Sequence, residues 1–323
     1  MVGLAALALS VLAACEPAPV PTGFGVTPVG GTTASTEQHV LTRAADGALW
    51  TAGMAAAVDR FAPSTGLHAT VVLPGEGTAV MDLLPGPAGS VLVAAWSSDG
   101  YGWSGDGRVL RIEADLSVHT VLELGAEAVP GGLAHDGLSG FWVSDGTGDR
   151  ILRSSFDGGL VEVFDLPEGV GPTALVATGH DTVRFVTAFA PGLGLLDAGT
   201  GAVEVDPNDA AYSLAVSFSL IVGPDGKLWY TRLGSHGMFR FDPDTGTTEE
   251  IDGSELWPRE LAVGADGGVY ATLMCGLADG LARVDPATLE VTTFDIGLSS
   301  DRGTALGSIV RDGPGFWAVG HPS

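Results

Sequence analysis

Residues 221–251, IVGPDGKLWYTRLGSHGMFRFDPDTGTTEEI, contain the pattern that decides the fold. Asp-Gly precedes an aliphatic and then an aromatic residue, a glycine-containing gap follows, and Asp-Pro-Asp-Thr-Gly separates two further short runs. Asp, Gly and Pro at such places favour tight turns, so the stretch predicts hairpins of short strands. A single occurrence would mean only two hairpins, whereas a recurrence would fix the whole architecture.

The pattern recurs along the whole chain at similar intervals. Its aromatic or aliphatic anchor falls, at steps of 42, 50, 43, 44, 41 and 47 residues, on Trp50, Leu92, Trp142, Phe185, Trp229, Tyr270 and Trp317. A strand–turn–strand pattern follows each of the first six anchors, and no stretch has a helical period of useful length. A period in the forties is typical of four-stranded propeller blades. We therefore predict an all-β, seven-bladed β-propeller of four-stranded antiparallel blades over residues 36–323.

The seventh repeat stops at Ser323, soon after its anchor, and so lacks two outer strands. Residues 22–29, TGFGVTPV, precede the first repeat. Closing a ring with a strand from the other end of the chain removes a free sheet edge. We expect this N-terminal segment to close the last blade.

The N-terminus has the pattern of an export signal. The apolar run from Val2 to Ala14 is too short to span a bilayer, and Leu12-Ala13-Ala14-Cys15 is similar to the lipobox of bacterial lipoproteins. The resemblance implies a signal peptide over residues 1–14 and an acylated Cys15. Residues 15–35 would then hold the acylated cysteine, a Pro-rich tether and the closing strand. We expect an exported protein anchored to the bacterial cell envelope through its lipid alone.

The composition excludes several other classes of protein. The formal net charge is −25 and Lys227 is the single lysine, so the chain is expected to repel nucleic acid. Cys275 is the one cysteine left after Cys15, which excludes an intramolecular disulfide in the mature chain. We expect a monomer.

Three segments resemble known propeller families. The stretches IVGPDGKLWYTR…GMFRFDPDTG and LAVGADGGVYATLMCG resemble repeats of virginiamycin B (streptogramin) lyase, and VPGGLAHDGLSGFWVSDGTGDRILRSSFDGG resembles NHL-type repeats. The lyase resemblance implies ester opening by elimination, with magnesium, a Glu-Pro-His and a Pro-His from the preceding blade. Here Trp257-Pro258-Arg259 and Ser217-Phe218 occupy those places. The gluconolactonase-like propellers are a second relative, but Gly131-Gly132 stand where they would need an acidic ligand.

Comparison of equivalent repeat positions gives the candidate site residues. Three residues after each anchor, only Asp145 and Arg232 are charged, and at the inner-strand starts His39 and Arg259 differ from their small or apolar equivalents. Burying an unpaired charge is costly, so these residues point either to a ligand or to one another. Two arginines on adjacent blades would bind a carboxylate, phosphate or sulfate. Alternatively, they pair with Asp145, Glu260 or Asp301.

Aromatic and histidine residues add further candidates. The irregular loop 96–107 carries Tyr101 and Trp103, which suit sugar stacking or capping of a pocket, with Asp99 and Asp106 beside them. Trp257 and His236 are expected at the same mouth of the channel. The sequence predicts no definite cofactor. A divalent cation, calcium or magnesium, is the one candidate, and Asp-Pro-Asp-Thr-Gly lacks the rest of a calcium-binding loop.

These patterns favour a non-catalytic binding or scaffold module. Its partner would be an unidentified small molecule, glycan or envelope protein, bound at the top face of the central channel. The alternative is a metal-dependent lyase or hydrolase related to streptogramin lyase, with rearranged residues such as His39, Asp145, Glu260 and His321. A fold alone does not decide between these two classes.

Overall fold

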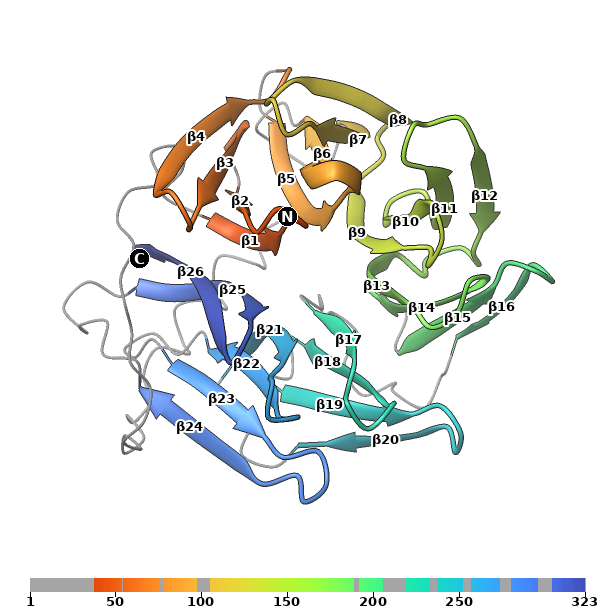
Figure 1. The fold of residues 1–323 in the computed structure, drawn as a ribbon. Coiled ribbons are helices and arrows are strands. Elements are labelled where there is room, and N and C mark those ends of the chain that lie inside the picture. The colour runs from red at the N-terminus through yellow and green to blue at the C-terminus, as the bar shows by residue number, and fades with distance from the viewer. Residues whose placement is uncertain are drawn as a thin grey trace, which may run out of the picture.

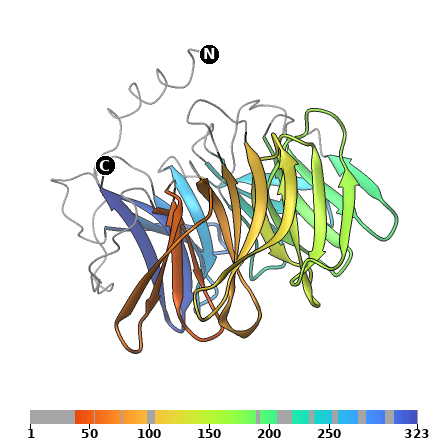
Figure 2. The same ribbon diagram turned by 90° about the horizontal axis from the view of Figure 1, so that it is seen from above.

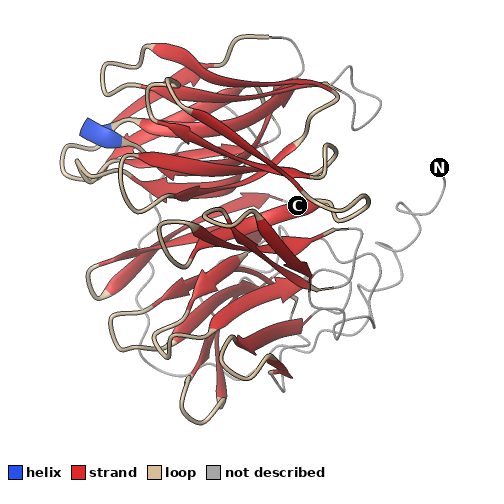
Figure 3. Ribbon diagram, turned by 90° about the vertical axis from the view of Figure 1, so that its right-hand side faces the viewer, coloured by secondary structure: helices blue, strands red, loops and turns tan. Residues whose placement is uncertain are grey.

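The computed structural model describes residues 38–53, 55–75, 78–97, 105–188, 192–205, 219–232, 237–251, 257–273, 280–295 and 304–322. These residues form antiparallel sheets arranged as a ring around a central axis (Figure 1). The strands run along that axis, as the two side views show (Figures 2 and 3). Within the described ranges, no helix has the length and apolar character needed to cross a bilayer.

Six sheets have four strands each, added in chain order from the centre of the ring to its rim. Blade 1 contains β1 (Gln38–Arg43), β2 (Leu49–Gly53), β3 (Ala57–Ala62) and β4 (Leu67–Val72). Blade 2 contains β5 (Thr78–Pro85), the short 3₁₀ helix η1 (Pro87–Gly89), β6 (Val91–Ser97), β7 (Asp106–Ile112) and β8 (Val118–Ala126). Blade 3 contains β9 (Pro130–His135), β10 (Gly140–Asp145), β11 (Arg150–Ser155) and β12 (Val161–Asp165).

The second half of the chain repeats this order. Blade 4 contains β13 (Pro172–Ala177), β14 (Thr182–Thr187), β15 (Leu193–Asp197) and β16 (Ala202–Val205). Blade 5 contains β17 (Leu220–Val222), β18 (Leu228–Arg232), β19 (Gly237–Asp242) and β20 (Thr247–Glu250). Blade 6 contains β21 (Pro258–Val263), β22 (Val269–Leu273), β23 (Gly280–Val284) and β24 (Val291–Asp295).

The last sheet has two strands in the described residues, β25 (Thr304–Asp312) and β26 (Gly315–Pro322). The prediction of four-stranded antiparallel blades is thus confirmed for six sheets, whereas seven complete blades are not present in the described part of the chain. Each inner strand contacts the next, and β25 contacts β1, which closes the ring. An ion pair of 2.8 Å between Arg43 of β1 and Asp312 of β25 spans this closure. The expected closing segment, residues 22–29, lies outside the described residues.

All seven predicted anchors lie on the second strand of their sheets. Trp50, Trp142 and Trp229 are fully buried and belong to clusters that join neighbouring blades. Burial of such large apolar side chains is the main favourable contribution to folding. The turn residues of the opening stretch also behave as predicted, because Gly226 (φ 75°) and Gly246 (φ 67°) adopt the left-handed conformation.

An Asp–aromatic–Arg unit recurs at the bottom face, where the first and second strands are joined. In blade 3, Asp136 in the turn forms an ion pair of 3.3 Å with Arg153, whose guanidinium lies 5.1 Å from the ring centre of Trp142. Arg153 and Trp142 are direct cross-strand neighbours. Blades 1 and 5 repeat the unit with Asp46, Trp50 and Arg60, and with Asp225, Trp229 and Arg240. These arginines therefore hold the bottom face together.

Candidate functional site

The inner strands carry β-bulges near the end where they begin. In β5, Val80 pairs with Ala95 and Asp82 with Ala94, so that Met81 is an extra residue. In β21, Pro258 pairs with Leu273 and Leu261 with Ala271, which leaves Arg259 and Glu260 opposite Thr272 alone. Comparable irregularities occur in β1, β9, β13 and β25. A bulge re-aims side chains, and bulges are frequent beside binding and catalytic sites.

Hydroxyl groups two residues after the anchors fix these bulges. Thr272 Oγ1 accepts a hydrogen bond from the Glu260 amide (3.1 Å) and donates one to the Gly307 carbonyl of the next sheet (3.0 Å). Ser144 bridges Gly132 and Thr173 in the same way, at 2.8 and 2.6 Å. The hydroxyl of Thr231 donates to the Arg259 carbonyl at 2.8 Å. The backbone of Arg259 and Glu260 is thus held by its own blade and by the preceding one.

Asp82 is a site residue that the sequence analysis did not select. Its Oδ1 accepts a hydrogen bond from the Leu83 amide (2.8 Å), and its Oδ2 accepts one from the Leu133 amide of the next inner strand (2.7 Å). The side chain is half-buried on β5, the first strand of its sheet. Burial within the ring raises the pKa of Asp82 to about 6, and the two amide hydrogen bonds oppose that rise.

Glu260 is the repeat equivalent of Asp82, and its strand β21 lies across the ring from β5 (Figure 1). The Ser219 hydroxyl bonds its carboxyl group, and Ser219 Oγ also accepts from the Leu261 amide at 3.1 Å. Burial raises the pKa of Glu260 to about 8, and the negative charge of Asp82 adds to the rise, whereas Arg259 and the Ser219 bond oppose it. At neutral pH, therefore, Asp82 is mainly ionised and Glu260 mainly protonated.

The two candidate arginines are both buried, but they occupy different environments. Arg259 is 7% exposed, and burial lowers its pKa, with the charge of Glu260 opposing the change. Arg232 is 2% exposed, and its guanidinium lies 5.4 Å from the ring of Tyr230 and 5.1 Å from that of Phe239. Burial lowers the pKa of Arg232 to about 10, opposed by Glu250.

Strand alternation shows where Arg232 points. It lies on the same face of β18 as Tyr230, whose cluster includes Val186 and Leu193 of blade 4. Thr231 points the other way, to blade 6, where it bonds Arg259. The Arg232 side chain is therefore directed to the interface with the preceding blade, and joint binding of one ligand by both arginines remains a prediction.

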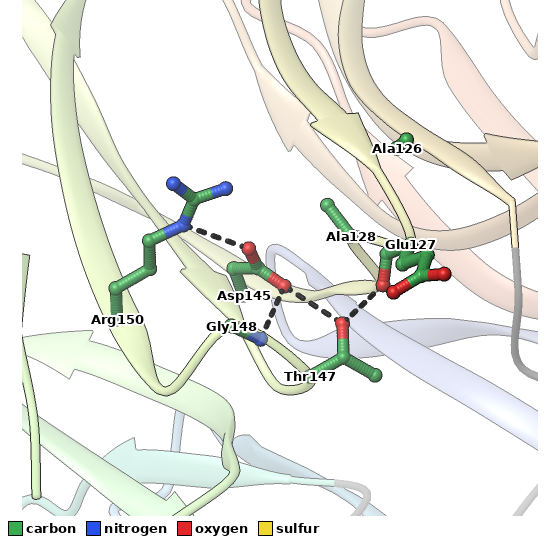
Figure 4. A pocket seen from close by; sticks show the side chains of 7 residues that line it. All are labelled: Ala126, Glu127, Ala128, Asp145, Thr147, Gly148 and Arg150. Carbon is green, nitrogen blue, oxygen red and sulfur yellow. Dashed lines mark hydrogen bonds and ion pairs between the residues drawn. The ribbon is translucent and has the colours of Figure 1, made fainter. Parts of the chain in front are cut away.

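Asp145 has a different partner from those expected. Its carboxylate is completely buried and forms an ion pair of 2.8 Å with Arg150, not with Arg232 or Arg259. Its other oxygen accepts hydrogen bonds from Thr147 Oγ1 (3.1 Å) and from the amides of Gly148 (3.1 Å) and Val129 (3.2 Å). Asp145 therefore orders the turn between β10 and β11 at the top face (Figure 4). The pairing of Arg259 with Glu260, which the sequence analysis also considered, remains a prediction.

The remaining candidates are only partly described. Trp257 is half-buried with a left-handed φ of 59°, directly before the Pro258 that begins β21. The backbones of His39 and His321 lie in β1 and β26, but their side chains fall outside the description. Tyr101, Trp103, His236 and Cys15 lie outside the described residues altogether. In the part of the chain that is described, no group of three or more His, Cys, Asp or Glu side chains is placed to hold a metal ion.

The sequence did contain a signal for Asp82. Asp82 and Glu260 follow Met81 and Arg259, which stand at equivalent places of their repeats, and the other residues at that position are Val40, Gly132, Leu175, Ser219 and Leu306. A comparison one residue further along each inner strand would have identified both carboxylates. The bulges themselves depend on strand register and have no such signal.

Comparison with known proteins gives one relative in sequence. Virginiamycin B lyase from Nocardia farcinica is 33% identical over 129 residues, which amount to 40% of this chain. The match spans 42% of the length of that curated relative. No family model matches the chain.

Solved structures extend the resemblance to most of the fold. Virginiamycin B lyase from Staphylococcus aureus, as a catalytically inactive variant with quinupristin, superposes with a TM-score of 0.72 at 18% identity, over 88% of this chain and 92% of that one. A streptogramin B lyase gives a TM-score of 0.72 at 18% identity, over 89% and 91% of the two chains. A putative 6-phosphogluconolactonase from Bacteroides uniformis gives 0.58 at 16%, over 79% and 83%. These structures share the fold and confirm the predicted resemblance to lyase-like propellers.

Proposed function

We propose that this virginiamycin B lyase-like propeller binds a small polar molecule at the end of its central channel and does not transform it. The supporting observation is the bulge of β21, which holds Arg259 and Glu260 at the channel through bonds from two blades. Arg259 would bind an anionic group by charge-assisted hydrogen bonds, and the protonated carboxyl of Glu260 would donate a further one. A glycan or an envelope protein that presents such groups would bind at the same place.

Departures from the lyase pattern support binding without catalysis. Trp257-Pro258-Arg259 stands where the resemblance implies a Glu-Pro-His, with Trp257 directly before β21 and Pro258 as its first residue. Indole and guanidinium groups at neutral pH do not abstract protons. The position that would supply a base and a metal ligand in the lyase therefore supplies neither here.

Quinupristin is the first ligand to test, because a similar fold has been crystallised with it. Calorimetric titration of the protein with quinupristin, and then with a set of small carboxylates and phosphates, would identify the ligand class. We expect Arg259→Ala to weaken binding by about tenfold or more, as for loss of a charge-assisted hydrogen bond. A ligand that binds Arg259→Ala and the unchanged protein equally well would overturn the channel site.

A second function is favoured by the carboxylate pair in the channel. Two carboxyl groups with pKa values of about 6 and 8 are the arrangement of a base and an acid in one site. The alternative is thus a lyase or hydrolase in which Asp82 removes a proton and Glu260 donates one, with calcium or magnesium as the cation. Arg259 would then orient the substrate.

Chromatography with mass detection separates these alternatives. Incubation with quinupristin, with magnesium or with EDTA, would give an eluting product of unchanged mass if the ring opens by elimination, or of one added water if the ester is hydrolysed. The binding proposal predicts neither product. If a product does form, we expect Asp82→Asn and Glu260→Gln to abolish it, and rates that fall on both sides of a maximum between about pH 6 and 8.

We further propose that the mature protein begins at an acylated Cys15 and that residues 22–29 complete a seventh blade. Palmitate labelling of cells that express the protein, compared with a Cys15→Ser variant, tests the anchor. Label on both proteins, or on neither, would count against lipidation at this cysteine.

A further inference from the structure

A second polar cavity lies away from the channel, at the top face between blades 2 and 3. Its volume is about 380 Å³, and its walls include Glu127 and Ala128 after β8 and Asp145, Thr147 and Arg150 of blade 3 (Figure 4). Pockets of about 300–1,000 Å³ are typical of small-molecule sites. The proposed function does not use any of these residues.

Arg150 on one side of the cavity uses only part of its donor capacity. Its Nε donates to Asp145 Oδ2 at 2.8 Å, and its Nη2 donates to the Leu124 carbonyl at 2.6 Å. Among the described residues, Nη1 has no hydrogen-bond partner, and the side chain is 29% exposed. Two hydrogen bonds thus hold the guanidinium in place, and its Nη1 stays available to a ligand.

Glu127 on the other side is positioned by its backbone. It adopts a left-handed conformation (φ 66°), and its carbonyl accepts a hydrogen bond from Thr147 Oγ1 at 2.6 Å. The side chain is exposed, and its carboxylate forms no ion pair with the residues that the structure describes. A non-glycine residue in this conformation persists only where the surroundings impose it.

Between these two groups, the charge of Asp145 is already compensated. Its carboxylate is neutralised by Arg150 and accepts three hydrogen bonds from Val129, Thr147 and Gly148. Figure 4 shows Asp145 and Thr147 between Arg150 and Glu127. The same ion pair uses the charge of Arg150, so the groups still to be satisfied are the Nη1 donor of Arg150 and, among the described residues, the unpaired carboxylate of Glu127.

We propose that this cavity binds a small zwitterion, an amino acid or a dipeptide, with its carboxylate on Arg150 and its ammonium on Glu127. A simple anion would meet the negative charge of Glu127, and a simple cation would leave the Nη1 donor of Arg150 without an acceptor. A dipolar ligand satisfies both ends with charge-assisted hydrogen bonds. This inference is independent of the channel site.

Calorimetric titration with single amino acids and with glycylglycine tests the proposal. We expect binding by at least one of these probes, and loss of binding when its amine is acetylated or its carboxylate is amidated. Glu127→Gln should weaken binding about 10- to 100-fold, the range for a hydrogen bond to a charged group. Glu123→Gln, an exposed change on the preceding strand β8, is the matched control and should bind normally.

Two further variants separate this site from others. Arg150→Lys keeps the charge, but its single ammonium nitrogen cannot take the place of the guanidinium fork that bonds Asp145, the Leu124 carbonyl and a ligand, so it should also weaken binding. If Arg150→Lys does not fold, Glu127→Gln alone tests the site. Arg259→Ala should bind the zwitterion as the unchanged protein does. No binding by any probe at 10 mM, which is about the weak limit of useful affinity, would refute the proposal. Equal binding of Glu127→Gln and Glu123→Gln, or equal binding of the blocked analogues, would also refute it.

Discussion

At the scale of single residues, Trp142 and Trp229 occupy equivalent places but differ in one hydrogen bond. Both are fully buried, and an arginine lies over each ring. The indole N–H of Trp229 donates to Asp225 Oδ1 at 3.0 Å, whereas that of Trp142 has no partner in the described residues. The desolvation of the Trp142 N–H is therefore not compensated.

This difference predicts unequal costs for the same substitution. Trp→Phe removes similar volume at both places, but only Trp229→Phe loses a hydrogen bond. We expect Trp229→Phe to destabilise the protein by about 1 kcal/mol more than Trp142→Phe. Urea unfolding of both variants measures the difference, and a larger cost at Trp142 would contradict the assignment.

The channel carboxylates predict a dependence of stability on pH. Both have pKa values in the folded protein, about 6 and about 8, that exceed their ordinary values of 3.8 and 4.5. Over that interval the folded state holds more protons than the unfolded chain, so their contribution to stability is complete below about pH 4 and is lost as the pH rises through 6 and then 8.

Glu260→Gln removes the larger part of this dependence. We expect the melting temperature of the variant to exceed that of the unchanged protein at pH 8.5 and to vary less between pH 6 and 8.5. The gain should be a few degrees, since about 1 kcal/mol shifts the melting temperature by roughly 2–4 °C in domains of 150–250 residues. Calorimetric melting at several pH values measures it, with the exposed Glu290→Gln as control. If the melting temperatures of the unchanged protein, Glu260→Gln and Glu290→Gln change with pH in parallel, the pKa of Glu260 is not raised.

At the scale of elements, the second strand of a blade also holds the first strand of the next blade. The Thr231 hydroxyl, which is completely buried, bonds the Arg259 carbonyl at 2.8 Å. Thr231→Val keeps the shape but leaves that carbonyl without this donor, at a cost of about 1–3 kcal/mol. Thr248→Val on the exposed strand β20 should cost far less. Equal unfolding free energies for the two variants would mean that the inter-blade bond contributes little.

The elements were largely predictable, whereas the site was not. The anchors and the Asp-Gly turns are local signals, so all seven second strands and their order follow from spacing alone. Asp145 was one of three possible partners considered for Arg232 and Arg259 of other blades, but Arg150, five residues away, forms its ion pair instead. The pairing of charges depends on which face of a strand each side chain takes, and a bulge changes that face without any mark in the composition.

At the scale of the whole molecule, the ring is joined where β25 meets β1. The last sheet offers two strands in the described residues, so its outer edge has unpaired backbone groups unless another segment covers it. We propose that residues 22–29 cover this edge. Deletion of these residues should lower the melting temperature and speed proteolysis within β25 and β26, whereas deletion of residues 16–21 alone should do neither. Identical proteolysis of both deletion variants would exclude the closure.

The inner-strand bulges also determine how easily this channel can acquire a new specificity. Met81, Ala174 and Ser308 lie at the bulges of β5, β13 and β25. On both sides of each bulge the inner strand pairs with the second strand of its sheet. Blade 3 differs, because a Cβ atom at Gly131 would lie 2.9 Å from the Thr173 Cα of blade 4. This distance is shorter than the contacts that Cβ atoms make in folded proteins. Redesign of the channel rim is therefore restricted in blade 3, where only glycine fits at position 131.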